Sequence, residues 1–301
     1  MNCEYVKSLM GRLEFPSSSI DYLSLQCDRL KEGYEDYIDS RLKYFDEVDN
    51  EKLMEVQAQL KFIAEQMGIS SYTLDLIFLL CGCEILEKKF YEKGYSEKLF
   101  LDTMMDLRYK LKECQDVEGV EGVFTYSWFI DYFRLGRFYL GRYQFEFIPF
   151  HHKIFSVDGY TVKEGDRVLN IHIPSNGIPL TDEVRLNAYR EAYEFYKKDF
   201  PQGYIPIVCN SWLLYPDNDL IFPENSNILK FKQDFAIVNF CEWEGFANQW
   251  RVFGTRDGTV DYKDLPENSS LQRNIKKWLV SGKKLGGGNG VFFFDGEKII
   301  K

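Results

Sequence analysis

The chain has 301 residues, of which 45% are apolar and 28% are charged. This composition is typical of globular proteins and excludes disordered, collagen-like and coiled-coil chains. Its 47 acidic residues exceed the 37 basic ones, for a net charge of −10, so neither nucleic acid nor an anionic membrane surface is an expected partner. Aromatic residues make up 17% of the chain and predict thick cores or an aromatic-lined pocket.

The N-terminal segment MNCEYVKSLMGRLEF has no apolar stretch of the kind found in signal peptides. The longest strongly apolar run, Leu76–Cys83, is far shorter than the roughly 20 residues that span a bilayer. The seven cysteines form no Cys-x-x-Cys pair, which indicates free thiols in a reducing, cytoplasmic compartment. We expect no metal, because Cys81 and Cys83 lie two apart in a helical pattern and point away from each other.

Residues 1–118 predict a helical N-terminal domain. In three segments, apolar residues recur at spacings of three and four, as on one face of an amphipathic helix. These segments are 53–67, 74–85 and 100–111, with a weaker helical pattern over 19–40. Gly68 is suited to end the first helix, and Ser70 or Ser71 and Ser96 to cap the next two. The pattern favours a small helical bundle.

Charge and residue pattern both change near Gly119. Residues 1–118 carry 15 basic and 24 acidic side chains, a net charge of −9, whereas residues 119–301 carry 22 and 23, a net charge of −1. We therefore predict a domain boundary between residues 118 and 119. The second domain, 119–301, is the better location for an anionic ligand.

The second domain begins with short segments typical of strands. Residues 137–148 alternate aromatic and polar side chains and predict one strand, and residues 167–173 predict another. Between them, the dipeptide Asp158-Gly159 predicts the turn of a hairpin over 150–165. A compact loop follows at 174–180, and Thr181 is suited to cap the next helix.

The rest of the chain alternates between strands and helices. We expect strands over 204–209, 235–243, 249–253 and 290–294, with broken helix over 212–233 and a helix over 269–280. Gly286–Gly290 lacks the pattern of a phosphate-binding loop and predicts a flexible turn. The fold class is therefore α+β, with an all-α N-terminal domain followed by a mixed β-sheet flanked by helices.

The alternation of strands and helices between Arg167 and Phe253 is the most informative part of the chain, and it opens with a strand, a glycine-containing loop and a helix. A loop that leads into a helix presents unpaired backbone N–H groups and the positive end of the helix dipole. Such a place binds a phosphate or carboxylate. We therefore look for ligand-binding residues in and beside this loop.

Several polar side chains near this loop are candidates for chemistry. His172 has the right intrinsic pKa for a general base, although a strand histidine bonded to a carbonyl would look the same. Glu146 is either a partner in that role or part of a solvated strand face. Cys209 is either a nucleophile or a buried thiol. Asn210 and Ser211 follow it at the end of a strand, where substrates are commonly oriented.

Six segments together resemble a known family. They are RLGRFYLGRYQFEF, VLNIHIPSNGIPLT, IVCNSWLLYP, SNILKFKQDF, WRVFG and LPENSSLQR. They are similar to bacterial acyltransferase-domain proteins that join an all-α N-acyltransferase N-terminal domain to a GNAT-like C-terminal domain. The resemblance spans most of 119–301. It implies transfer of an acyl group from acyl-CoA or acetyl-CoA, as co-substrate, to an amine or hydroxyl of a small molecule or peptide.

The resemblance also implies site residues. The loop that grips the CoA pyrophosphate maps to Ser175, Asn176, Gly177, Ile178, Leu180 and Thr181. The strand edge that pairs with pantetheine maps to Ile171, His172 and Ile173, and the strand that splays from it includes Cys209 and Asn210. By analogy with tyrosine acids in the family, Tyr215 would be the general acid.

Two functions remain open at this point. Retention of His172, Asn210 and Ser211 favours an acyltransferase. The loop, however, has one glycine and no basic residue, and Asp182 and Glu183 in the following helical turn would repel a pyrophosphate. That favours a non-catalytic ligand-binding protein on the same fold that has lost cofactor binding. The sequence carries no signal for an oligomeric state.

Overall fold

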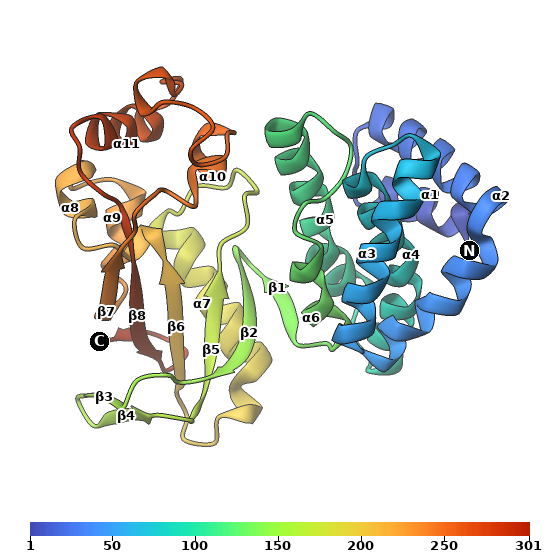
Figure 1. The fold of residues 1–301 in the computed structure, drawn as a ribbon. Helices are drawn as coiled ribbons and strands as arrows, with labels where there is room; N and C mark the ends of the chain where they lie inside the picture. The colour runs from blue at the N-terminus through green and yellow to red at the C-terminus, as the bar shows by residue number, and fades with distance from the viewer. The chain divides into compact units, whose positions relative to one another are not determined.

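A computed structural model describes residues 1–301, which form two compact units, Met1–Phe138 and Tyr139–Lys301 (Figure 1). The division lies after Phe138, later than the change in composition at Gly119. Residues between these points belong to the helical unit through specific contacts. Val123 N donates to Tyr72 O at 3.0 Å, and Trp128 Nε1 donates to Asp106 Oδ2 at 2.8 Å.

The first unit is all helical, as predicted. Its elements are α1 (Cys3–Arg12), α2 (Ser17–Glu47), α3 (Asn50–Met67), α4 (Ser71–Glu92), α5 (Glu97–Glu118), the 3₁₀ turn η1 (Tyr126–Phe129) and α6 (Ile130–Phe133). Ser70 and Ser96 cap α4 and α5, and Gly68 ends α3 in the left-handed conformation. The apolar run Leu76–Cys83 is buried on all sides because it lies within α4 at the centre of this unit. No helix of the chain combines the length and apolarity required to cross a membrane.

The second unit is built on a mixed sheet, whose first strand starts two residues before the unit boundary. The strands are β1 (Arg137–Leu140), β2 (Tyr143–Pro149), β5 (Arg167–His172), β6 (Ile205–Ser211), β7 (Ala236–Glu242), β8 (Gly286–Phe294) and β9 (Ile299–Ile300). The order is β1-β2-β5-β6-β8-β7, with β9 paired to β8. β5 and β6 run parallel, whereas β2 with β5, β6 with β8 and β7 with β8 are antiparallel.

Each face of this sheet has its own cover (Figure 1). On one face, α7 (Asp182–Tyr196) packs Tyr189 against Phe292 and Phe294 of β8. On the other face, the predicted hairpin of β3 (Ile154–Val157) and β4 (Tyr160–Lys163) stacks two rings on Phe293. The hairpin covers only one end of its face and leaves the carboxyl ends of β5 and β6 to other residues.

The region between β6 and β8 forms a second core. Its elements are η3 (Trp212–Leu214), α8 (Asn218–Ile221), α9 (Asn227–Lys232), α10 (Gln249–Phe253), η4 (Tyr262–Asp264) and α11 (Ser270–Val280), while η2 (Lys197–Asp199) follows α7. Phe246, Ile275 and Leu285 lie at its centre. The expected helix at 269–280 is confirmed, with Ser269 and Gln272 forming a capping box.

Three local predictions were wrong. Residues 137–148 form two strands, because Gly141 adopts φ 61° and lies so close to α7 that an added Cβ would meet Ala188 Cα at 2.7 Å. Residues 249–253, expected as a strand, form the short helix α10. The glycine run, expected as a flexible turn, is the first half of the interior strand β8.

The space around β8 explains its glycines. A Cβ on Gly286 would lie 2.6 Å from the ring of Tyr215, and one on Gly287 would lie 2.7 Å from the ring of Trp243. A Cβ on Gly290 would lie 2.7 Å from Phe235 Cβ. Neighbouring side chains occupy the volume that strand side chains would normally fill, so these positions require glycine although glycine disfavours strands.

Candidate active site

His172 and Glu146 form the centre of the candidate site. They lie on the neighbouring strands β5 and β2, where Glu146 is opposite Asn170 and His172 is opposite Gln144. His172 Nε2 and Glu146 Oε1 are 2.5 Å apart, and Asn170 Nδ2 donates to the same carboxylate oxygen at 3.2 Å. The side chains of His172 and Glu146 are 24% and 15% exposed, so solvent and ligands reach the pair.

Gln144 adds a buried polar group beside this pair. Side chains two residues apart on a strand share a face, so Gln144 and Glu146 lie on the same side of β2. Gln144 is only 1% exposed and its Nε2 has no hydrogen-bond partner. A buried donor without a partner is destabilising, so Gln144 Nε2 is a group to which a bound acceptor could be joined.

The pairing of β5 with β6 ends next to His172. The two strands are in register at Leu169–Ile207 and Asn170–Val208, and no pair is formed beyond these. β5 nevertheless continues through Ile171 and His172, and β6 continues to Ser211. Past Asn170, the backbone of β5 therefore has a ladder partner only on its β2 side, at Ile171 and His172.

Arg142 holds the loop that follows β5. It lies between β1 and β2 and is 6% exposed. Its Nε donates to Ile178 O at 2.9 Å, and its Nη1 donates to Pro174 O at 3.0 Å. No pattern in the sequence indicates this role for Arg142, because the loop itself has no basic side chain and Arg142 lies more than thirty positions earlier in the chain.

The loop has a defined shape. Asn176 Oδ1 accepts from Ile178 N at 3.0 Å and its Nδ2 donates to Tyr139 OH at 2.8 Å. Gly177 has φ 75°, and a Cβ at this position would meet nothing within 4 Å. Ser175 and Ile178 are exposed, whereas Leu180 is buried. An open glycine in the left-handed region allows close approach of a ligand to the backbone.

The start of α7 is less acidic in effect than its sequence indicates. Thr181 caps the helix by accepting from Val184 N at 3.4 Å. Asp182 pairs with Arg185 at 3.1 Å and with Lys230 at 3.6 Å. Arg185 is itself buried and also pairs with Asp234 at 2.7 Å. The expected repulsion of an anion by Asp182 is therefore reduced by Lys230 and by Arg185, a cation that Asp182 shares with Asp234.

Three other candidates, Cys209, Ser211 and Tyr215, lie on the opposite face of the sheet from the His172–Glu146 pair. The face that carries His172 is fixed by the register: Val208 pairs with both Asn170 and Val291, so these residues and Asn289 share it. Cys209 and Ser211 alternate onto the opposite face. There, burial raises the pKa of the Cys209 thiol to about 12, and Ser211 Oγ caps η3 by accepting from Leu213 N at 3.2 Å.

Tyr215 also lies on the opposite face. Its ring lies where a side chain at Gly286 would be. Gly286 faces the side of β8 opposite to that of Gly287 and Asn289. Its hydroxyl donates to Glu242 Oε1 at 3.1 Å, and burial raises its pKa well above the usual value. The structure thus brings His172, Glu146 and Asn210 to one face but does not bring Tyr215 or Ser211 to them.

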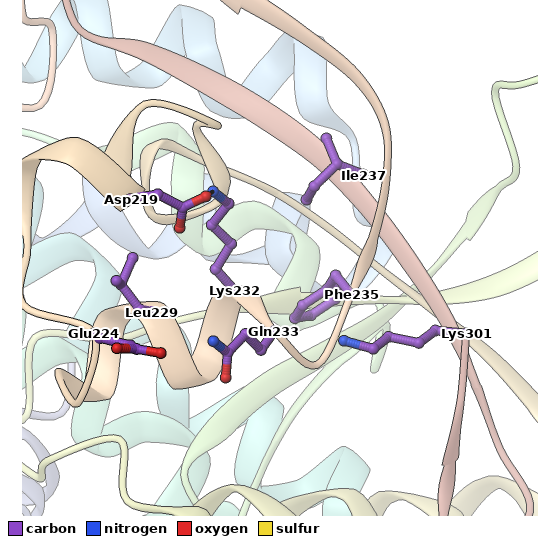
Figure 2. Close-up of a pocket in the computed structure, with 8 residues that line it drawn as sticks. All are labelled: Asp219, Glu224, Leu229, Lys232, Gln233, Phe235, Ile237 and Lys301. Atoms are coloured by element: carbon purple, nitrogen blue, oxygen red, sulfur yellow. Dashed lines mark hydrogen bonds and ion pairs between the residues drawn. The ribbon is translucent and has the colours of Figure 1, made fainter.

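A separate pocket of about 570 Å³ lies beside β7 and α9. Figure 2 shows Lys232 and Lys301 extending into it with Gln233 and Phe235. Lys232 is already held by Asp219 Oδ2 at 2.8 Å and Pro216 O at 2.7 Å. None of the predicted site residues lines this pocket. No group of three or more His, Cys, Asp or Glu side chains is arranged to hold a metal ion.

The comparisons with known families agree with this architecture. Residues 137–292 match the GNAT-like C-terminal domain, and residues 5–135 match the N-acyltransferase N-terminal domain. The chain belongs to the family that has this GNAT-like C-terminal domain. No curated protein matches its sequence.

Solved structures share the fold of this family member over nearly its full length. An acyltransferase in complex with decanoyl-CoA and teicoplanin is 19% identical, with a TM-score of 0.71 over 96% of this chain and 87% of that one. An acyltransferase in complex with decanoyl-CoA is 19% identical, with a TM-score of 0.68 over 95% and 86%. One in complex with CoA and 10C-teicoplanin is 17% identical, with a TM-score of 0.70 over 95% and 86%.

Proposed function

We propose that this protein transfers an acyl group from acyl-CoA to an amine or hydroxyl of a small molecule or peptide. The observation that carries the proposal is the end of β5–β6 pairing at Asn170 and Val208, immediately beside the His172–Glu146 pair. The unpaired edge at Ile171–Ile173 offers backbone groups to a pantetheine arm, whose amides pair as a strand would. The acyl-CoA complexes of the structurally similar acyltransferases support the same donor.

The loop 174–181 is our candidate binding site for the CoA pyrophosphate. It leads into the N-terminus of a 15-residue helix, α7, where backbone N–H groups and the helix dipole favour an anion. Arg142 fixes the loop through the carbonyls of Pro174 and Ile178. Gly177 leaves one side of it open. Arg185 and Lys230 pair with Asp182 and so reduce one of the two negative charges that favoured the alternative of a non-catalytic binding protein.

The chemistry follows from the pair of side chains. Glu146 accepts the Nε2–H of His172, which leaves the lone pair on the other ring nitrogen. That nitrogen removes a proton as the acceptor amine attacks the thioester carbonyl carbon. The C–S bond then breaks, and the proton held by His172 passes to the departing sulfur. Thioester and amine become amide and free CoA thiol.

The test measures binding and turnover separately. Acetyl-, octanoyl- and decanoyl-CoA are titrated calorimetrically, and release of CoA thiol is followed with a panel of amines and alcohols. A ligand at 100 times its Kd adds about 2.7 kcal/mol to the free energy of unfolding, which thermal unfolding detects. Binding with acceptor-dependent thiol release supports the enzyme. Binding without release identifies a non-catalytic protein, and no thermal shift at millimolar acyl-CoA overturns both.

A further inference from the structure

Asn289 is an unusual residue for its position. It lies on β8, an interior strand between β6 and β7, and it is the one residue of that strand that is not buried. It is also the only polar side chain in the strand, flanked by Gly288 and Gly290. Asparagine is depleted in strands, so local preference does not explain this choice.

A second carboxamide lies directly across from it. Asn289 is in register with Asn210 on β6, and Asn210 is the one exposed residue of that strand. Neither carboxamide makes a hydrogen bond within the chain. By contrast, Asn239 on β7, which is in register with Asn289 on the other side, accepts from Phe240 N at 2.9 Å. The two unpartnered carboxamides therefore offer both donors and acceptors to something outside the chain.

The register places this pair next to the catalytic candidates. Asn170 pairs with Val208, so His172 and Asn210 each lie two residues further along their parallel strands, on the same face. The unpaired stretch between β5 and β6 thus has the His172–Glu146 pair on one side and the Asn210–Asn289 pair on the other. A thioester carbonyl in that stretch would lie between a base and two carboxamides.

The surroundings of the pair are apolar. Along β8, the next residue on the same face in one direction is Val291, which belongs to the core under the β3–β4 hairpin. In the other direction it is Gly287, which is covered by the indole of Trp243. Along β8 itself, Asn289 is therefore the one polar side chain between these two apolar neighbours.

We propose that Asn210 and Asn289 recognise the acyl acceptor, and that this acceptor carries a neutral hydrogen-bonding group, a hydroxyl or amide, beside its nucleophilic amine. This inference rests on the proposed function. Two carboxamides bind a neutral donor–acceptor group without attracting charge. A site built to bond such a group rejects analogues that lack it, because its own polar groups would remain unpaired.

The experiment compares two acceptors of matched size, a 2-amino alcohol and the alkylamine with methyl in place of hydroxyl. In the unsubstituted protein, kcat/KM is expected to favour the amino alcohol by at least about tenfold. Asn289→Ala and Asn210→Ala are each expected to lower kcat/KM for the amino alcohol about tenfold more than kcat/KM for the alkylamine, so that the preference between the two acceptors is lost. Asn187→Ala, on α7 with its amide bonded to Glu191, is the matched control and should change neither.

The outcomes separate this inference from the proposed function. Asn210 is exposed, so Asn210→Ala tests the inference even if Asn289→Ala fails to fold. Equal kcat/KM for the two amines in the unsubstituted protein, or an equal loss for both amines in the variants, overturns the recognition role and leaves acyl transfer standing. No thiol release with any acceptor overturns the proposed function and this inference with it. Calorimetric Kd values for acyl-CoA should stay within about twofold in both variants.

Discussion

Arg142 and Ile178 are joined by a hydrogen bond of 2.9 Å from Nε to the carbonyl oxygen, across 36 positions of sequence. The same guanidinium bonds Pro174 O at 3.0 Å, so one buried cation fixes both ends of a five-residue turn. The shape of the candidate pyrophosphate loop therefore depends on a side chain from the turn between β1 and β2.

Arg142→Met should loosen this loop. The substitution keeps much of the apolar stem but leaves two carbonyls without their donor. Hydrogen bonds from a charged group contribute roughly 1.5–3 kcal/mol each, so the free energy of unfolding should fall by at least about 2 kcal/mol, and acyl-CoA affinity should fall at least tenfold. Arg190→Met on the exposed side of α7 is the control. Unchanged affinity in Arg142→Met would place the anion elsewhere.

Substitutions at the His172–Glu146 pair should reduce turnover and spare binding. His172→Ala removes the proposed base and should lower kcat by about 10²–10⁴-fold, the usual contribution of general base catalysis. Glu146→Gln keeps the shape but loses the carboxylate that orients the imidazole, so it should cost less. Single-turnover assays and calorimetry separate the two effects. If His172→Ala weakens acyl-CoA binding in proportion to kcat, the residue is a binding group and not the base.

Gly177→Val tests whether the loop 174–181 binds the ligand. Gly177 has φ 75° with open space where a Cβ would be, so the substitution introduces backbone strain of about 1–3 kcal/mol without a clash. Acyl-CoA binding should be lost, because the branched side chain occupies the side from which a ligand approaches. Gly165→Val is the matched control, since Gly165 has φ 86° and equally open space at the end of the β3–β4 hairpin. Similar losses of binding in both variants would indicate general destabilisation.

Asp75 makes the stability of the helical unit depend on pH. It is 2% exposed, its Oδ1 has no partner, and its Oδ2 accepts from Gln57 Nε2 at 2.8 Å. Burial raises the pKa of Asp75 to about 7. Above its ordinary pKa the unfolded chain loses this proton, whereas the folded chain keeps it until about pH 7. The free energy of unfolding should therefore fall as pH rises from about 4 to 7 and level off above that.

Denaturant titrations of Asp75→Asn provide the check. The amide cannot ionise, so this part of the pH slope should disappear, and the difference between the two proteins should grow in favour of the variant as pH rises. Parallel pH profiles for the two proteins would contradict the assignment. The buried hydroxyl of Tyr126, which lies near Asp75 and also has no hydrogen-bond partner, does not contribute to this slope, because a tyrosine is neutral from about pH 4 to 7 and burial raises its pKa further.

The sequence predicted the parts of the site that depend on local pattern. Alternation along two segments placed Glu146 and His172 on strands, and Thr181 was identified as a cap from its position before a helix. What it missed depends on contacts between distant segments. Arg142 reaches a loop more than thirty residues away, and the glycines of β8 are explained only by rings such as those of Tyr215 and Trp243. Residues 249–253 are too few for their period to distinguish a helix from a strand.

The position of β8 has a consequence for how the second unit forms during synthesis. β7 joins the sheet only through β8, and 43 residues separate the end of β7 from the start of β8. A nascent chain that has emerged as far as Leu285 therefore holds β7 as a detached segment and leaves the edge of β6 open. Unpaired edges are prone to aggregation, and the glycines of β8 provide little side-chain contact to set its register. Ribosome-stalled chains ending before and after β8 should differ sharply in protease resistance, with the sheet protected only in the longer one.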